Sequence, residues 1–87
     1  ILLADDEYHV ISHLTTLLQQ LEKYEVNILS TCSGPEALSL VGSLRIDIAF
    51  LDINMPKVNG LMIADKLHRQ WPECQIIFLT AYEVLYL

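Results

Sequence analysis

The chain has 87 residues, and its 11 acidic side chains against five basic ones give a formal net charge of −6 at pH 7. A chain of this length forms one domain at most, and its negative charge disfavours binding to nucleic-acid phosphates or to anionic lipid surfaces. Although 53% of the residues are hydrophobic, no apolar run approaches the roughly 18 to 20 residues that a membrane span requires.

The first half of the chain predicts strands that alternate with helices. The apolar runs ILLA at residues 1–4 and VNILST at 26–31 have the composition of strands buried on both faces, as in a parallel sheet. Between them a helix is expected over about residues 7–22, because apolar side chains recur there at helical spacing. The expected buried stripe of this helix is Val10, Leu14, Leu17, Leu18 and Leu21.

A second helix is predicted where the stretch SGPEALSLV begins. Pro35 suits the first helical position, and the carboxylate of Glu36 favours the positive end of the helix dipole. The residues expected to be buried on this helix are Ala37, Leu38, Val41 and Leu44.

The second half of the chain continues the alternation. IDIAFL at 46–51 and QIIFL at 75–79 predict two more strands, and a third helix starts between them after Asn59 and Gly60. That helix is expected to end before Pro72, and its buried residues are Ile63, Ala64 and Leu67. The final stretch, TAYEVLYL at 80–87, is expected to begin a fourth helix.

This order of elements predicts an α/β fold with a doubly wound parallel sheet and right-handed crossovers. Ligands bind such sheets at the carboxyl ends of the strands. Asp5 and Asp6 follow the first strand, Asp52 follows the third and Thr80 follows the fourth. Three carboxylates and a hydroxyl are therefore expected to converge on one site.

Clustered carboxylates repel one another, so the site is expected to hold a proton or to recruit a cation. Magnesium prefers oxygen ligands and binds through one or two carboxylates together with a phosphate group. With such an ion present, Asp52 could attack a phosphoryl group, and the Thr80 hydroxyl could donate a hydrogen bond to one of its oxygens.

The segments ADDE at 4–7, LDINMPKVNG at 51–60 and LTA at 79–81 together resemble the receiver domain of two-component response regulators. This resemblance implies a flavodoxin-like topology with strand order 2-1-3-4 and a cytoplasmic location. It makes residues 1–87 one receiver domain, trimmed by a few residues at its N-terminus. A fifth strand and a fifth helix would be missing from the C-terminal end.

The resemblance also implies a role for each residue of the site. Asp52 would accept a phosphoryl group from a sensor histidine kinase in a magnesium-dependent reaction, and Thr80 would be the switch hydroxyl. The magnesium ligands would be Asp6 directly, Asp5 mainly through water, Asn54 through its backbone carbonyl, and Asp52 itself. Such a domain is not an enzyme in the usual sense, because it promotes only its own phosphorylation and dephosphorylation.

The partners follow from the same resemblance. The stretches FLDINMP and FLTAY resemble receivers attached to LytTR-type or related transcriptional regulators more than they resemble receivers of the chemotaxis type. The full protein would then carry a C-terminal DNA-binding output domain, while this segment would bind neither nucleic acid nor membrane. The kinase would recognise the exposed face of the first helix and the strand-end loops.

The sequence is expected to depart from the family pattern, because no fifth strand that supplies a lysine for the phosphoryl group is predicted. Lys23, Lys57 and Lys66 all lie elsewhere. An alternative is therefore a receiver-like protein-interaction module that is not phosphorylated in this form. An uncovered edge on the fourth strand, or the fourth helix, could also pair with a second copy in a homodimer.

Three other kinds of site are disfavoured by the sequence. A phosphatase of the haloacid dehalogenase type needs an acid two residues after its aspartate nucleophile, and Asn54 occupies that position. His9 and His13 share a helix face, but no third ligand accompanies them, so we interpret them as solvated side chains. Cys32 and Cys74 form no CxxC pair and predict reduced thiols.

Overall fold

The computed structural model describes residues 1–21, 24–79 and 84–86, and within these residues the chain forms a five-stranded sheet. Its strands lie in the order β2-β1-β3-β4-β5, and the first four are parallel to one another. Their bounds are Leu2–Ala4 (β1), Leu29–Thr31 (β2), Ile48–Asp52 (β3) and Gln75–Leu79 (β4). The predicted order 2-1-3-4 is confirmed, although β2 is shorter than the predicted strand.

The C-terminal segment differs from the prediction. Val84–Tyr86 forms a fifth strand, β5, which pairs antiparallel with β4, where a fourth helix was expected. β5 occupies the outer edge of β4, so the prediction that this edge is free for a homodimer is wrong as well. The edge of β4 offers unpaired backbone N–H and C=O groups, and residues of high strand propensity can form hydrogen bonds with them. These hydrogen bonds stabilise the strand more than a short helix would be stabilised by its own local pattern.

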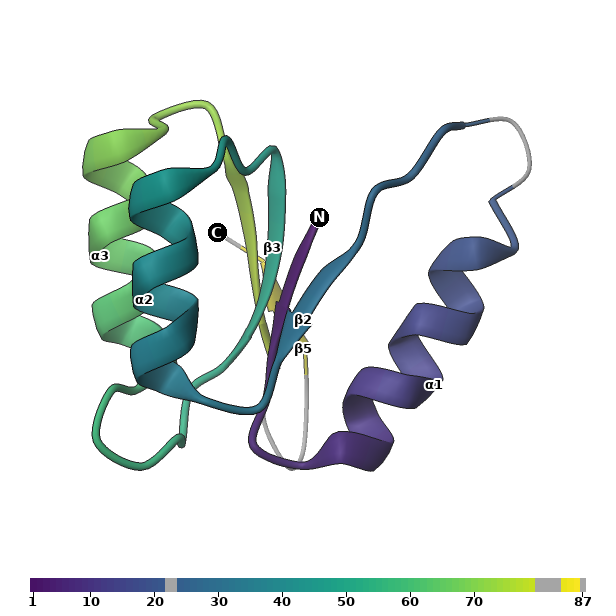
Figure 1. Cartoon of the computed structure of the whole chain (residues 1–87), viewed down its shortest axis with the longest axis horizontal. Coiled ribbons are helices and arrows are strands. Elements are labelled where there is room, and N and C mark those ends of the chain that lie inside the picture. Colours follow the sequence, from purple (N-terminus) through teal and green to yellow (C-terminus); the bar gives the residue numbers. More distant parts are fainter. Residues whose placement is uncertain (22–23, 80–83, 87) are drawn as a thin grey trace.

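Helices α2 (Gly34–Ser43) and α3 (Gly60–Gln70) cover one face of the sheet, as Figure 1 shows. Each helix begins at a capping side chain: Ser33 Oγ accepts a hydrogen bond from the Glu36 N–H, and Asn59 Oδ1 accepts one from the Met62 N–H. The buried core between these helices and the sheet contains Leu2, Ala4, Ala37, Val41, Ile46, Ala49, Leu51, Met55, Ile63, Leu67 and Phe78.

The end of α2 departs from the predicted burial. Leu44 was expected to be buried, but 43% of it is exposed. It is the C-terminal cap of the helix and has an extended backbone, with φ −130° and ψ 146°, so the helical spacing no longer applies to it.

Helix α1 (Tyr8–Gln19) lies on the opposite side of the sheet from α2 and α3, and it packs less than the sequence predicts (Figure 1). Ile11 is its one buried residue, whereas Leu17 and the following Leu21 are 48% and 47% exposed. The predicted stripe is therefore wrong at Leu17 and Leu21, whereas Val10, Leu14 and Leu18 are half-buried, and the helix is shorter than 7–22. An apolar stripe requires an equally large apolar surface opposite it, and helical spacing does not report that surface.

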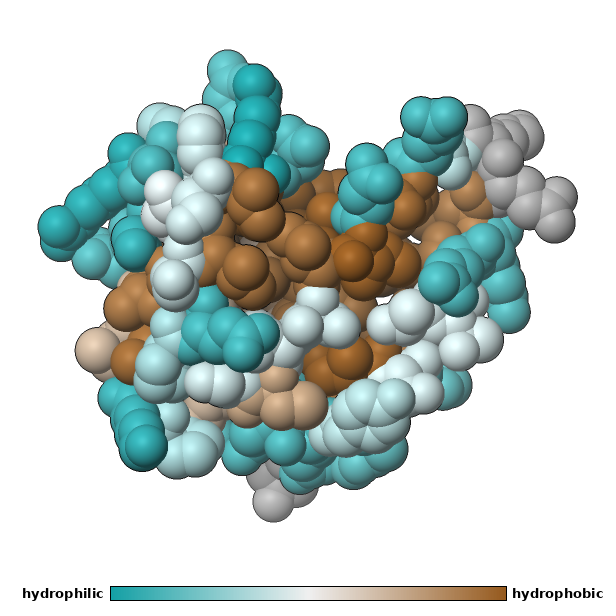
Figure 2. All heavy atoms as spheres, in the orientation of Figure 1, coloured by the Kyte–Doolittle hydropathy of each residue, from teal (hydrophilic) through white to brown (hydrophobic). Residues whose placement is uncertain are grey.

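An open apolar groove of about 420 Å³ lies between the end of α1 and the sheet. Its lining includes Ile1, Leu21, Val26 and Ile48. Figure 2 shows apolar side chains at the surface between the two helix layers. Among the described residues, no helix has the length and apolar character needed to span a membrane.

The same Leu→Ala substitution is expected to lower the free energy of unfolding by different amounts on the two faces of the sheet. Leu67→Ala, at a fully buried position of α3, should lower the free energy of unfolding by about 2 to 5 kcal/mol. Leu17→Ala, at a half-exposed position of α1, should lower it by no more than about 1 kcal/mol. Urea denaturation of both variants measures the difference, and equal losses would contradict the packing described here.

Candidate functional site

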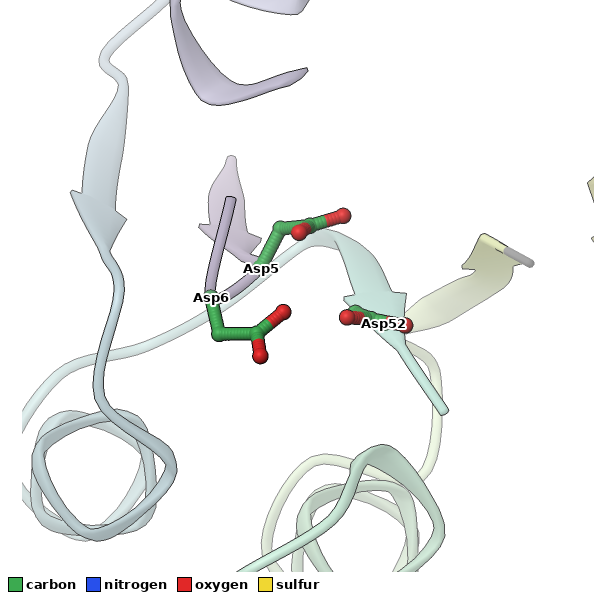
Figure 3. A group of neighbouring side chains, drawn as sticks. All are labelled: Asp5, Asp6 and Asp52. Atoms are coloured by element: carbon green, nitrogen blue, oxygen red, sulfur yellow. The ribbon is translucent and has the colours of Figure 1, made fainter. Parts of the chain in front are cut away.

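Three aspartates meet at the carboxyl ends of β1 and β3. These strands are neighbours in the sheet, with Ala4 opposite Leu51, so Asp5 and Asp6 emerge beside Asp52. One carboxylate oxygen from each aspartate lies within 4.8 Å of the other two. In Figure 3 the carboxylates of Asp6 and Asp52 point toward each other. The predicted convergence of these three residues is therefore observed.

Local hydrogen bonds hold two of the carboxylates in place. Asp5 Oδ1 accepts a hydrogen bond of 2.8 Å from the Glu7 N–H, and Asp52 Oδ1 accepts one of 3.1 Å from the Asn54 N–H. Aspartate commonly bonds to the backbone two residues further on, which stabilises a turn directly after a strand. Each of these bonds uses one of the two oxygens of its carboxylate.

The loop after β3 is held by its contact with Gly60. A Cβ atom at Gly60 would lie 2.3 Å from the backbone oxygen of Asp52, so a side chain cannot be accommodated there without movement of the strand end. The Gly60 N–H donates a hydrogen bond to the Ile53 carbonyl, and Met55 is buried in the core. The first turn of α3 therefore packs directly against the peptide that carries Asp52.

The aspartates line a shallow cavity of about 190 Å³. Its other lining residues are Glu7, Val10, Asn54 and Leu79. Asn54, a predicted ligand through its carbonyl, is thus at the site, whereas Thr80 lies outside the described residues. The sequence did not predict that Val10 and Leu79 line this cavity. An apolar residue at a strand end or on a helix indicates that it is buried, but not that it lies beside a site.

Burial dominates the electrostatics of the cluster. It is the largest cause that raises the pKa of Asp52 from 3.8 to about 6. The Asn54 hydrogen bond opposes this rise, whereas a hydrogen bond to Asp6 and the charges of Asp5 and Asp6 contribute to it. Burial also raises the pKa of Asp5, of which only 5% is exposed. Such a cluster favours a bound cation over three free negative charges.

Residues 1–86 match the protein family described as the response regulator receiver domain. The chain belongs to this family. The match covers all three predicted motif segments, including the aspartates at the ends of β1 and β3. The predicted resemblance and flavodoxin-like receiver fold are therefore confirmed.

Relatives of this receiver domain are longer regulators. The positive alginate biosynthesis regulatory protein of Pseudomonas aeruginosa is 40% identical over 83 residues, which are 95% of this chain and 34% of that protein. The response regulator SaeR of Staphylococcus aureus is 41% identical over 81 residues, 93% of this chain and 34% of SaeR. The chain thus spans about a third of the length of these relatives.

Solved receiver structures share the fold. The response regulator TrrA of Thermotoga maritima, crystallised with magnesium and beryllium fluoride, has a TM-score of 0.79 and 38% identity, covering 94% of this chain and 69% of its own. A response regulator of Burkholderia pseudomallei, crystallised with a phosphorylated aspartic acid and a calcium ion, has a TM-score of 0.73 and 26% identity. That comparison covers 94% of this chain and 46% of the Burkholderia chain.

The described lysines lie away from the carboxylates in this receiver. Lys66 Nζ donates a 2.8 Å hydrogen bond to the Leu38 carbonyl and so links α3 to α2. Lys57 lies in the loop after β3, with a left-handed backbone at φ 67°. Neither of them lines the cavity.

The raised pKa of Asp52 predicts a pH-dependent stability in the absence of divalent metal. Between about pH 4 and 6 the folded state keeps a proton that the unfolded state releases, so stability falls as the pH rises through this window. Asp52→Asn removes that loss and should raise the free energy of unfolding at pH 7 by about 1 to 2 kcal/mol, allowing for solvent screening.

Urea denaturation in EDTA from pH 4 to 7 measures this effect. Asp47→Asn is the matched control, because Asp47 is exposed and pairs with Arg45 outside the cluster. We expect it to change stability by less than about 0.5 kcal/mol. If the stability of Asp52→Asn followed the same pH dependence as that of the wild type, the raised pKa of Asp52 would be contradicted.

Proposed function

We propose that Asp52 accepts a phosphoryl group from a sensor histidine kinase in a magnesium-dependent reaction, and that this modification switches the output of the protein. The observation that carries the proposal is the cluster of Asp5, Asp6 and Asp52, whose ligand atoms lie within 4.8 Å of one another. Hard oxygen donors in this number and spacing suit a small divalent cation.

The residues of the cluster divide the chemistry between them. Above about pH 6 the Asp52 carboxylate is ionised, and the burial that raises its pKa also makes it a better nucleophile. One of its oxygens forms a bond to phosphorus while the bond from phosphorus to the donor's imidazole nitrogen breaks. The electron pair of that bond stays on the nitrogen, which is left as neutral imidazole or takes a proton from solvent.

Asp5, Asp6, Asp52 and the Asn54 carbonyl are the groups that would hold magnesium. When bound, the ion supplies positive charge that offsets the charge on the phosphoryl oxygens. The chain's own part is to position its carboxylates. Asp5 is fixed by the Glu7 N–H and Asp52 by the Asn54 N–H, so neither needs to reorganise when the ion arrives.

The solved relatives support this assignment. TrrA was crystallised with magnesium and beryllium fluoride, and the Burkholderia pseudomallei protein contains a phosphorylated aspartic acid and a calcium ion. In the present chain, Thr80 is proposed to supply the hydroxyl that donates a hydrogen bond to the phosphoryl group. We propose that the domain promotes only its own phosphorylation and dephosphorylation and does not catalyse a reaction of a separate substrate.

The wider protein is proposed to be a cytoplasmic transcriptional regulator. Its relatives are response regulators about three times as long as this chain. A C-terminal DNA-binding domain, of LytTR or a related type, would then receive the signal, because the acidic receiver is itself unsuited to binding nucleic acid. The histidine kinase would dock at the exposed face of α1 beside the aspartates.

Phosphoryl transfer predicts a change in intact mass. Incubation of the native protein with magnesium and a small acyl phosphate should add one phosphoryl group, and Asp52→Ala should add none. Asp47→Ala, which removes an exposed carboxylate outside the cluster, should still be phosphorylated. Uptake that persisted in Asp52→Ala would contradict the proposal, and no uptake by the native protein would favour an unphosphorylated interaction module.

Magnesium binding predicts a stabilisation that depends on the cluster. At about ten times its dissociation constant, magnesium should stabilise the folded state by about 1.4 kcal/mol, or roughly 5 to 10 °C in Tm. Asp6→Ala should lose most of this shift, whereas Asp65→Ala, an exposed carboxylate paired with Arg69, should keep it. Equal thermal shifts in the two variants would refute the metal-binding role of Asp6.

A further inference from the structure

A second glycine brings helix α2 into contact with the loop that follows Asp52. Gly34 is the buried first residue of α2. A Cβ atom at this position would lie 2.0 Å from the backbone oxygen of Val58 and 2.9 Å from its carbonyl carbon. Carbon atoms in contact are normally 3.5 to 4.0 Å apart. The helix start therefore touches the loop backbone, which cannot move aside as a flexible side chain could.

The touched peptide leads directly to the phosphoacceptor. Val58 lies two residues before Gly60, and Gly60 in turn packs against the backbone oxygen of Asp52. The backbone between the two contacts has little freedom to rotate. The Val58 N–H donates a hydrogen bond to the Pro56 carbonyl, and the Asn59 side chain caps the start of α3. Two close backbone contacts in series thus connect α2 to Asp52.

We propose that Gly34 is a positioning residue for Asp52. By allowing α2 to touch Val58, it sets, through Gly60, where the Asp52 carboxylate lies relative to Asp5 and Asp6. A methyl group at position 34 pushes Val58 and the start of α3 away, and the three carboxylates then no longer match one ion. This role rests on the proposed function, since the cation and the phosphoryl group are what the carboxylates position.

Helix α2 offers a matched control at its other end. Gly42 is exposed, and a Cβ atom there would meet only the end of the Lys66 side chain, with Nζ at 2.9 Å and Cε at 3.5 Å. That side chain can rotate away, although it then loses its hydrogen bond to the Leu38 carbonyl. Gly34→Ala and Gly42→Ala therefore add the same methyl group to the same helix, and only the first presses on a backbone that leads to Asp52.

The experiment compares magnesium affinity and phosphorylation in the native protein and the two variants, at a temperature where circular dichroism shows all three folded. Isothermal titration calorimetry gives the magnesium dissociation constant, and intact mass gives the rate of modification by an acyl phosphate. We expect Gly34→Ala to weaken magnesium binding and slow phosphorylation by about tenfold or more, and Gly42→Ala to change neither by more than about twofold.

A purely structural role would lower the Tm of Gly34→Ala and leave its magnesium affinity unchanged. Equal affinities and rates in the two variants would overturn the positioning role. Failure of the native protein to bind magnesium or to be phosphorylated would instead overturn the proposed function, so the two failures are distinguishable.

A measurement on the native protein decides the matter if Gly34→Ala does not fold. Magnesium titrated into isotope-labelled protein should shift the backbone amide resonances of Gly34, Glu36 and Val58 and leave that of Gly42 in place. The proposed coupling would be overturned if magnesium shifted the resonances of Asp52 and Asn54 but not those of residues at the start of α2.

Discussion

Electrostatic repulsion among three carboxylates is the constraint on which the site depends. Two neighbouring parallel strands bring one carboxylate oxygen from each of Asp5, Asp6 and Asp52 within 4.8 Å of one another, and the burial of Asp5 and partial burial of Asp52 remove some of the water that would screen them. Burial is the largest cause that raises the pKa of Asp52 to about 6, and the neighbouring carboxylates add to it, so without a cation Asp52 holds a proton up to that pH. In the proposed function, a divalent ion would relieve the same repulsion and leave Asp52 ionised. The pH dependence of stability, the proposed metal binding and the proposed nucleophilicity of Asp52 would therefore all follow from one arrangement.

The surrounding fold keeps these carboxylates from moving apart. Helices α2 and α3 fill one face of the sheet, and their first residues, Gly34 and Gly60, pack against the loop that begins at Asp52. The opposite face carries α1, which buries little. The receiver thus has one firmly packed layer that positions the site and one loosely packed layer beside it. A partner that docks on α1 would meet the cluster from its less constrained side.

Much of the site could be predicted because it follows from parallel strands. The carboxyl ends of such strands share one edge, so Asp5, Asp6 and Asp52 had to converge once β1 and β3 were neighbours. Packing between distant elements was harder. The spacing of Leu17 shows an apolar stripe but not what faces it, and Val84–Tyr86 became a strand because β4 presented a free edge. Close backbone contacts such as Gly34 with Val58 leave no pattern in one sequence.

The most direct test of the central claim is the pKa of the Asp52 carboxyl group itself. A carbon-detected nuclear magnetic resonance titration can follow this group in EDTA and again with saturating magnesium. We predict a midpoint near pH 6 without the ion and a fall to below about 4 with it, because the cation favours the ionised form. A midpoint that stayed the same in both titrations would contradict the claim that the cluster is built to hold a divalent ion.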